Sequence, residues 1–319
     1  MGPSPGGAAV TATIGVDLGG TKCLGVLLDD EGPVVAEHRV PTPAPATPGA
    51  IVDAIVEVVA GLGGSARVGV GAPGLVDGDG VLRFAPNLPG VTNLALRAEL
   101  QRRLPGTTAR VDNDATCAGW AEWRVGAARG SDQMLLITLG TGIGGGIVAG
   151  GRLERGANGF AGEIGHMVVD PHGPACVCGK RGCWERFASG SGLGRLAREA
   201  AQAGRGRRMV ALAGGDPEAV RGEHVTRACA EGDAEALEVM RQFAWWLALG
   251  LVNLAYAFDP ETFVIGGGLV EAGEVLLEPT RAAFADLLAG SAYRPAVAIV
   301  AAQLGERAGA IGAALVARE

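Results

Sequence analysis

Positive charge is scarce in this sequence. Its 319 residues include 27 lysines and arginines against 34 aspartates and glutamates, which gives a formal net charge of -7 and a pI near 5.3. A surface of this charge lacks the basic footprint with which proteins bind DNA, RNA or anionic membranes. The acidic balance does not exclude a small phosphorylated ligand, because a cleft can be locally positive and a metal ion can neutralise phosphate.

The chain also lacks a segment suited to entering a membrane. Its first ten residues, MGPSPGGAAV, have neither the basic segment nor the apolar run of a secretory signal. The most apolar stretch, Phe243 to Phe258, contains Asn253 and is shorter than the roughly 20 residues that span a bilayer. We therefore expect a buried helix there, with Trp245 and Trp246 in a core or an interface, and a cytoplasmic protein.

Cysteines are few, and in a cytoplasmic chain they indicate metal ligands or buried thiols more than disulfides. Cys23, Cys117 and Cys229 are isolated in the sequence. We expect each of them to be a small buried apolar residue without chemistry of its own.

The other cysteines lie in the segment GHMVVDPHGPACVCGKRGCWE with a histidine. Its candidate ligands are His166, Cys176, Cys178 and Cys183. The spacing H-x9-C-x-C-x4-C suits a closed tetrahedral zinc site of three thiolates and one imidazole. Glu163 and Glu185 flank this segment. Tethering to a metal loop favours a fixed orientation for these two carboxylates over the usual surface role of an isolated glutamate.

Glycine is abundant, and the pattern of apolar runs indicates a fold of two domains. The 54 glycines gather mostly in clusters beside apolar runs, which marks turns where the backbone approaches a ligand or another strand. A chain of this length with 48% hydrophobic residues exceeds what one core usually fills, so we expect two domains that share a cleft. Strands alternate with helices, which predicts an α/β fold.

Two strand-turn-strand units with a similar layout stand about 120 residues apart. The first is TATIGVDLGGTKCLGVLL and the second is QMLLITLGTGIGGGIVAGGRL. They predict a duplicated architecture in which each half presents a glycine turn to one cleft, although two unrelated hairpins would have the same layout.

Helical spacing and strand runs elsewhere complete the expected α/β order. We expect a helix from Ala50 to Leu62, strands in RVGVGAPG, TARVDND and ETFVIGGGLV, and a helix beginning near Ala115. The terminal GERAGAIGAALVA is expected to form a helix that packs back onto a sheet. The domains are predicted as residues 1–112 with 300–319, and residues 113–299.

The first glycine turn, DLGGTK, has the residues of a phosphate loop. Gly19 and Gly20 leave room for backbone N–H groups to approach a phosphate, Thr21 adds a hydroxyl and Lys22 a cation. Asp17 can hold a divalent ion directly or through water. The turn is neither a Walker loop nor a dinucleotide fingerprint, because a strand follows it. A plain hairpin turn is the alternative.

Two further glycine clusters support a nucleotide cleft. The turn GTGIGGG, residues 140–146, matches GxGxxG, a weak signal alone, and strands on both sides disfavour a Rossmann fold. The cluster Gly266 to Gly268 follows an apolar strand and could admit the flat face of a nucleobase.

Polar residues near predicted turns are candidates for catalysis and substrate binding. Asp112 and Asp114 flank Asn113 at a strand-to-helix junction. A carboxylate fixed there could accept a proton from a hydroxyl that attacks a phosphoryl group, but Asp114 could equally cap the next helix. Asn87, in APNLPG, has a similar alternative as a turn former.

Together these motifs resemble the ROK family (repressors, open reading frames and sugar kinases), and within it the bacterial glucokinases. The matching segments run in the family's order over nearly the whole chain: DLGGTK at 17–22, GAPG at 71–74, NLPG at 87–90, NDA at 113–115, TLGTGIGGG at 138–146, GEIGH at 162–166 and CVCGKRGCWE at 176–185. The resemblance implies an actin-like ATPase fold, with two ribonuclease H-like domains about a cleft for sugar and ATP.

The resemblance also implies roles for single residues. Asp114 would be the catalytic base that takes the proton from the sugar 6-hydroxyl. The residues implied for Mg²⁺ and ATP are Asp17, Gly19, Gly20, Thr21, Lys22, Thr141, Gly142, Gly144, Gly145, Gly146, Gly266 and Gly267. Those implied for the sugar are Asn87, Asn113, Asp114, Glu163, His166 and Glu185. His166 would place one ring nitrogen on zinc and the other toward the sugar.

On this resemblance we expect ATP-dependent phosphorylation of glucose at the 6-hydroxyl, the first step of glucose use in glycolysis. The alternatives are a kinase for fructose, mannose, N-acetylmannosamine or N-acetylglucosamine, and a non-catalytic sugar sensor. Family repressors carry a helix-turn-helix domain before the first phosphate loop; about ten residues precede it here, so we expect no nucleic-acid partner. Polyphosphate-using relatives lack the cysteine cluster, which favours ATP. We expect a homodimer or homotetramer.

Overall fold

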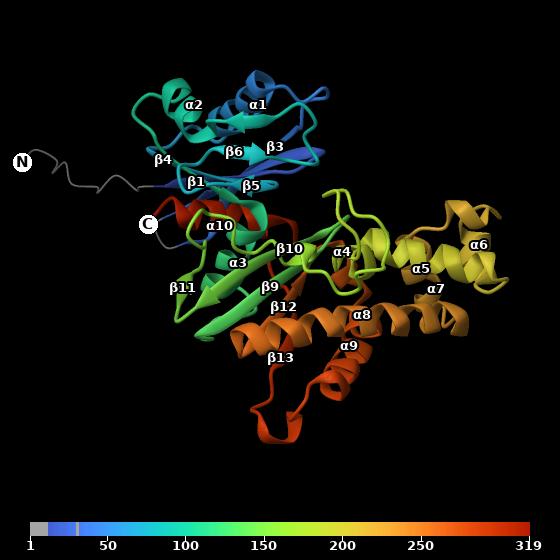
Figure 1. Cartoon of the computed structure of the whole chain (residues 1–319). Coiled ribbons are helices and arrows are strands. Elements are labelled where there is room, and N and C mark those ends of the chain that lie inside the picture. Colours follow the sequence, from blue (N-terminus) through green and yellow to red (C-terminus); the bar gives the residue numbers. More distant parts are fainter. Residues whose placement is uncertain (1–11, 30–31) are drawn as a thin grey trace, which may run out of the picture. The chain divides into compact units, whose positions relative to one another are not determined.

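The computed structural model describes residues 12–29 and 32–319, which form two compact units (Figure 1). The first unit contains the described residues up to Ala121 together with Arg155–Phe160 and Arg307–Glu319. The second unit contains Glu122–Glu154 and Ala161–Glu306. Each unit has its own cluster of buried apolar side chains.

The first unit is built on a five-stranded sheet with the order β3-β2-β1-β4-β8. Its strands are β1 (Thr13–Leu18), β2 (Lys22–Leu28), β3 (Val34–Pro41), β4 (Arg67–Ala72) and β8 (Thr108–Asn113). The hairpin of β1 and β2 and the strand β3 are antiparallel, whereas β4 and β8 continue the sheet parallel to β1.

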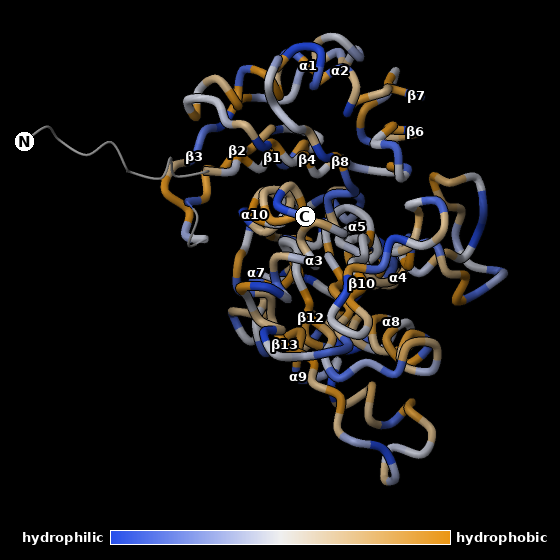
Figure 2. The backbone as a smooth tube through the Cα atoms, turned by 90° about the vertical axis from the view of Figure 1, so that its left-hand side faces the viewer, coloured by the Kyte–Doolittle hydropathy of each residue, from blue (hydrophilic) through white to orange (hydrophobic). Residues whose placement is uncertain are grey.

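Helices cover both faces of this sheet (Figure 2). Helices α1 (Pro48–Gly61) and α2 (Leu96–Arg103) lie on one face, and α10 (Ala308–Val316) lies on the other. Glycines in the strands let α10 approach closely, because a Cβ atom at Gly15 or Gly69 would lie 1.9 or 1.8 Å from a carbonyl oxygen of α10. The predicted return of the C-terminal helix onto a sheet is therefore confirmed.

A small antiparallel sheet follows β4. It has the order β5-β6-β7, with β5 (Leu75–Val76), β6 (Leu82–Phe84) and β7 (Thr92–Leu94). These strands were not predicted from the sequence, because strands of two or three residues are too short to show an alternating pattern.

The second unit repeats the strand order of the first in the sheet β11-β10-β9-β12-β13. Its strands are β9 (Gln133–Leu139), β10 (Ile143–Ala149), β11 (Arg152–Leu153), β12 (Thr262–Gly266) and β13 (Ala298–Ala301). Here too the hairpin of β9 and β10 is antiparallel and β12 and β13 are parallel to β9. The predicted duplication is confirmed.

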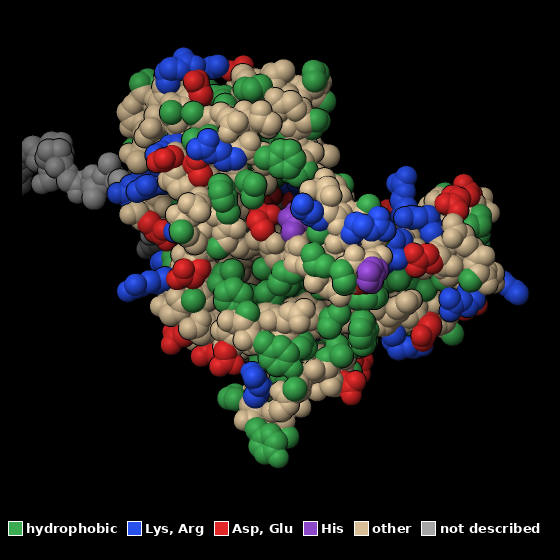
Figure 3. Space-filling model, viewed as in Figure 1, with side chains coloured by type: hydrophobic (Ala, Val, Ile, Leu, Met, Phe, Trp, Pro, Cys, Tyr) green, Lys and Arg blue, Asp and Glu red, His purple; other side chains and the backbone are tan. Residues whose placement is uncertain are grey.

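Helices make up most of the rest of the second unit. They are α4 (Glu185–Ala188), α5 (Gly190–Gln202), α6 (Arg207–Leu212), α7 (Gly222–Ala230), α8 (Ala234–Phe258) and α9 (Glu274–Leu287). Figure 3 shows acidic and basic side chains interspersed over α5 to α7. The predicted apolar helix is the C-terminal part of α8, where Leu247 and Leu251 are fully buried and Trp245 is 40% exposed. Across residues 12–29 and 32–319, no helix has both the length and the apolar content needed to cross a bilayer.

Besides a C-terminal part of the first unit that begins at Arg307 and not at residue 300, the boundaries of the units differ from the expected ones in two places. Helix α3 (Asp114–Val125) begins in the first unit, because its first turns pack on α10: a Cβ atom at Gly312 would lie 1.7 Å from the Cys117 carbonyl oxygen. The segment Arg155–Phe160, which was expected in the large domain, also belongs to the first unit by its contacts. Both differences arise from packing between residues far apart in the sequence.

Candidate active site

The first glycine turn joins β1 to β2 and is held by a residue that sequence analysis did not consider. Gly19 donates its N–H to the Lys22 carbonyl (2.9 Å), which closes the turn. Thr42 donates its hydroxyl to the Gly19 carbonyl (2.7 Å) and its N–H to the Thr21 carbonyl (3.1 Å). The segment that contains Thr42 therefore fixes the shape of the turn, with Thr21 exposed at its tip.

Asn87 lies beside this turn. It is exposed in a turn that Leu88 closes by donating its N–H to the Ala85 carbonyl (3.0 Å). A Cβ atom at Gly20 would lie 3.5 Å from the Cβ atom of Asn87. Asn87 is thus both part of a turn and a neighbour of the first glycine turn.

Asp17 is the penultimate residue of β1, and its carboxylate lies close to Gly309 near the start of α10. A Cβ atom at Gly309 would lie 2.7 Å from the Asp17 Oδ2 atom, so only glycine leaves room for this carboxylate. Burial, followed by the nearby charge of Asp114, raises the pKa of Asp17 from 3.8 to about 7, although Lys22 acts in the opposite direction. The two carboxylates are thus close enough to interact electrostatically.

The raised pKa of Asp17 predicts how stability depends on pH. Between about pH 4 and 7 the folded protein keeps a proton on Asp17 that the unfolded chain releases, so the free energy of unfolding should fall as pH rises, by at most about 4 kcal/mol. Asp17→Asn removes this titration. Urea denaturation at pH 5 and pH 8 should show the variant gaining stability relative to the wild type at the higher pH. An equal difference at both values would contradict the assignment.

The start of α3 separates the roles of two neighbouring residues. Asn113 Oδ1 accepts the N–H of Thr116 (2.9 Å) and therefore caps the helix, while its Nδ2 donates to the Gly74 carbonyl (3.0 Å). Asp114 Oδ1 accepts the adjacent N–H of Ala115 (2.7 Å). The capping role considered for Asp114 thus belongs to Asn113, which retains one amide hydrogen for a ligand.

The second glycine turn rests on the start of α5. Gly140 accepts the N–H of Gly190 (2.8 Å), and the Ser191 hydroxyl donates to the Thr141 carbonyl (2.7 Å). Thr141 is exposed, and Gly142 is half-buried. The N-terminus of α5, a helix of 13 residues, therefore lies next to a turn of exposed backbone, an arrangement that favours a phosphate group.

The glycines after this turn are not part of it, which corrects the expected span. Gly144, Gly145 and Gly146 belong to β10, and the last two are buried. A Cβ atom at Gly145 would lie 2.6 Å from the Gly162 carbonyl oxygen. Gly145 is thus needed for the strand to pack against the loop that carries Glu163.

The third glycine cluster begins at the end of β12. Gly266 is buried at the end of β12, and Gly267 lies on the backbone of Leu139, where a Cβ atom would be 2.5 Å from the carbonyl oxygen. Gly268 instead lines a cavity of about 570 Å³ in the second unit. The other polar and apolar lining residues include Thr141, Ser191, Arg198, Arg221, Glu223 and Leu269. Of these, Thr141 was predicted from the sequence, whereas Ser191, Arg198, Arg221 and Glu223 were not, because α5 and the start of α7 contribute them from separate parts of the chain.

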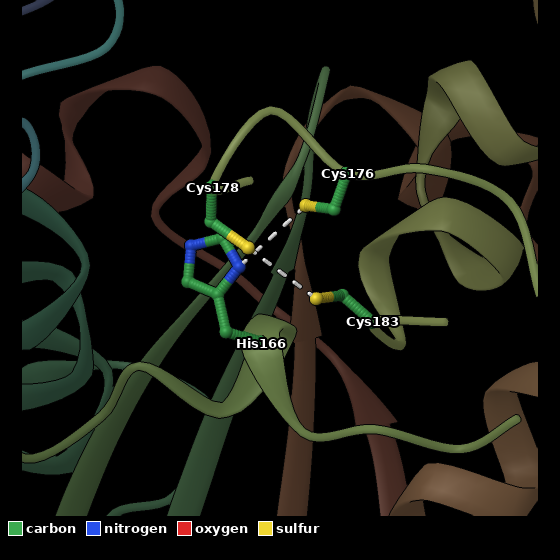
Figure 4. Close-up of side chains that lie close together, drawn as sticks. All are labelled: His166, Cys176, Cys178 and Cys183. Atoms are coloured by element: carbon green, nitrogen blue, oxygen red, sulfur yellow. Dashed lines mark hydrogen bonds between the residues drawn. The ribbon is translucent and has the colours of Figure 1, made fainter. Parts of the chain in front are cut away.

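The four predicted metal ligands come together in the second unit (Figure 4). Their ligand atoms all lie within 4.8 Å of one another. The Sγ atoms of Cys178 and Cys183 are 3.6 Å apart, and Cys176 Sγ is 3.8 Å from His166 Nδ1. Two ligands each about 2.3 Å from a tetrahedral zinc ion are about 3.8 Å apart, so this donor set fits zinc in both chemistry and spacing.

Backbone hydrogen bonds hold the ligand loops together. Cys176 donates its N–H to the Lys180 carbonyl (2.8 Å), which forms the tight turn carrying Cys178. Trp184 donates its N–H to the Met167 carbonyl (2.7 Å) and thereby places Cys183 beside His166. The geometry of the cluster is thus fixed by the chain itself.

Two carboxylates adjoin the cluster and link it to the second glycine turn. Glu163 Oε2 is 3.8 Å from His166 Nε2, on the side of the ring opposite the cysteines. The Cys176 thiol donates to Glu185 Oε1 (2.9 Å), and burial, followed by this hydrogen bond, raises the pKa of Cys176. A Cβ atom at Gly142 would lie 2.4 Å from Glu185 Oε2. The expected neighbours Glu163, His166 and Glu185 are therefore brought together.

Burial also raises the pKa of Glu163, with His166 opposing and Glu185 reinforcing the shift. The isolated cysteines Cys23, Cys117 and Cys229 are all buried, as predicted.

Two sheets of the same strand order, each with a glycine turn in its first hairpin, define the actin-like ATPase fold. The chain belongs to the ROK family, whose family model matches residues 13–319.

Individual relatives match the chain along nearly its whole length. A glucokinase from Streptomyces coelicolor is 43% identical, covering 96% of this chain and 98% of the relative. A ROK family glucokinase from Streptomyces griseus, solved in complex with glucose and AMPPNP, is 42% identical with a TM-score of 0.85, and the match covers 96% and 99% of the two chains. An N-acetylmannosamine kinase from Escherichia coli is 36% identical over 96% of this chain and 98% of the relative.

Proposed function

We propose that this chain is an ATP-dependent glucokinase that phosphorylates glucose at the 6-hydroxyl and so supplies glycolysis. The observation that carries the proposal is the full-length match to a glucokinase that binds glucose together with an ATP analogue. The two glycine turns, the paired carboxylates at Asp17 and Asp114 and the Cys/His cluster are the features of this chain that support it.

Asp114 is the catalytic base in this proposal. The 6-hydroxyl oxygen forms a bond to the γ-phosphorus while the bond from that phosphorus to the β,γ-bridging oxygen breaks, and ADP leaves with the electron pair. The hydroxyl proton passes to the Asp114 carboxylate. Asn113 caps α3, and the first turn of the helix fixes the position of Asp114 at this junction.

Asp17 and the first glycine turn would hold Mg²⁺ and the phosphates. Mg²⁺ supplies charge neutralisation of the transferring phosphoryl group when it is bound. The turn that Thr42 braces offers the Gly20 and Thr21 backbone to phosphate oxygens, and Lys22 adds positive charge. Asp17 is the carboxylate placed to hold the ion, directly or through water.

The nucleotide would occupy the 570 Å³ cavity of the second unit. A cavity of this size is typical of sites for small molecules and cofactors. The α5 N-terminus and the turn at Thr141 would face phosphate oxygens, and Gly268 and Leu269 would contact the adenosine.

The Cys/His cluster would bind a structural zinc ion that braces the sugar-binding loop. Four protein ligands leave no open position on a tetrahedral ion, so the metal would not take part in phosphoryl transfer. With His166 Nδ1 toward the metal, Nε2 stays on the side of Glu163 and is available to a sugar hydroxyl. Asn87, Asn113, Glu163 and Glu185 complete the proposed sugar contacts.

We also propose a cytoplasmic location and a homodimeric or homotetrameric assembly. The reduced thiols of a zinc site are stable in a reducing compartment. The exposed Trp245 and Tyr256 on α8 offer an apolar surface for a second copy.

An ADP-release assay tests the function and its alternatives together. The panel would contain glucose, mannose, fructose, N-acetylglucosamine and N-acetylmannosamine with Mg·ATP. Glucose should give the highest kcat/KM. A preference for N-acetylmannosamine would support the alternative that the Escherichia coli relative represents, and no turnover on any sugar at millimolar concentration would refute a kinase and leave a sugar sensor.

A further inference from the structure

A short segment between two parts of the second unit makes its contacts with the first unit. Among residues 122–306, Arg155–Phe160 is the part that belongs to the first unit. We call this segment the strap. It joins β11 at one end to the loop that carries Glu163 and His166 at the other. Its two ends are held on the first unit by Arg155 and Gly159.

Arg155 fixes the beginning of the strap by an ion pair with a buried carboxylate. Its Nε atom donates to Asp112 Oδ2 (2.6 Å), and its Nη2 atom lies 3.3 Å from Glu319 Oε2. The Asp112 side chain is only 9% exposed. A carboxylate buried to this extent needs its partner, because loss of one member leaves an uncompensated charge away from water.

The other oxygen of Asp112 acts on the residues that precede the proposed base. Asp112 Oδ1 accepts the N–H of Asn113 (2.9 Å), and Asn113 in turn caps α3. Asp114 is the next residue. The Asp112 carboxylate therefore connects Arg155 to the backbone of Asn113, the residue before Asp114.

Gly159 fixes the end of the strap on the turn between β5 and β6. Its φ is +88°, and a Cβ atom there would lie 2.7 Å from the Val76 carbonyl oxygen and 2.9 Å from the Gly78 nitrogen. The backbone of the strap thus packs directly on backbone of the first unit, with no room for a side chain.

The length of chain after the strap limits how far the sugar loop can move. Glu163 follows Phe160 by three residues, which can span at most about 11 Å. The Cα atom of Glu163 therefore stays within that distance of Phe160, the last residue of the strap.

From these contacts we propose that Arg155 is a positioning residue for phosphoryl transfer. It holds Asp112 and thereby the backbone of Asp114, and it anchors the strap that restrains the Glu163 loop. The proposal rests on the proposed function, because it assigns Asp114 and Glu163 the roles given above.

Arg155→Met tests the proposal, since it removes the guanidinium and keeps an apolar stem. We expect kcat to fall about tenfold and KM for glucose to rise severalfold, because small displacements of reacting groups cost rate, while KM for ATP stays unchanged. Arg103→Met is the matched control. Arg103 pairs with Asp53 in the same unit, and its side chain is 35% exposed against 34% for Arg155. The control should keep wild-type constants.

A double variant separates the two effects of Arg155. In Arg155→Met with Asp112→Asn, the buried charge is gone and the amide oxygen can still accept the Asn113 N–H. We expect kcat to recover toward the wild-type value while KM for glucose stays raised, because the strap remains unanchored. Failure of kcat to recover would show that Arg155 does not act through Asp112.

Several outcomes would overturn the proposal while leaving the proposed function intact. A wild-type enzyme that phosphorylates glucose, with Arg155→Met giving the same kcat and KM, would do so. Equal losses in Arg103→Met would also do so. Thermal unfolding is measured for every variant; if Arg155→Met is unfolded, Arg155→Lys, which keeps the charge without the planar fork, should show the same split between constants to a smaller degree. A wild-type protein without sugar kinase activity would instead refute the proposed function.

Discussion

Asp114→Asn should lose most turnover while keeping its affinity for glucose. The amide can still form hydrogen bonds in the space of the carboxylate, but it cannot take the proton from the 6-hydroxyl. Removal of a general base costs about 10² to 10⁴ in rate, so kcat should fall within that range. Steady-state kinetics and glucose calorimetry on the same preparation measure both quantities.

The structure shows which effects of this variant can be attributed to the lost carboxylate. Asn113 caps α3, so the substitution should leave the helix start intact, and thermal unfolding of the variant checks this. Asp53→Asn, in the same unit on α1, is the matched control and should keep full activity. Near-normal kcat in Asp114→Asn would refute its role as the base, and loss of glucose binding together with kcat would indicate a binding role.

Cys178→Ser should release the metal and raise KM for the sugar before it affects ATP. Cys178 is exposed at the tip of the Cys176–Lys180 turn, so the change removes a ligand without opening a cavity. The loops bearing His166 and Glu185 would then lose their common anchor. Removal of a structural metal costs far more than loss of a surface contact, and we expect KM for glucose to rise about tenfold or more.

Metal content and kinetics together measure this effect. Elemental analysis should find one zinc ion per wild-type chain and almost none in Cys178→Ser. Val177→Ser, at a residue that is 76% exposed between two ligands, is the matched control and should keep both metal and kinetics. Tight zinc retention with unchanged kinetics in Cys178→Ser would show that another ligand, such as His172, completes the site. Acidification should release the metal as the thiolates and the imidazole take up protons.

The elements with strong local signals could be predicted from the sequence. The two glycine hairpins, the helix after Thr47 and the C-terminal helix each have an apolar period or a turn residue that marks them. The spacing of the three cysteines and His166 was sufficient to predict that they meet, because few residues separate them and the loop has little freedom.

Features that depend on distant contacts could not be predicted in this way. Gly145 looks like part of a phosphate turn until the loop at Gly162 is seen packed against it. Thr42 shows no pattern that connects it with the turn at Gly19. Arg155 lies 43 residues from Asp112 in the sequence, and nothing in the segment around it indicates a buried partner.

Trp184 gives the protein an internal optical reporter. It is fully buried between a proposed zinc ligand, Cys183, and a proposed sugar ligand, Glu185, and its Nε1 donates to the Trp246 carbonyl (2.8 Å). Its ring fills a notch at Gly250 of α8, where any side chain would collide with it. Metal or sugar bound by these neighbours is therefore expected to change the fluorescence of this indole, one of the chain's five tryptophans.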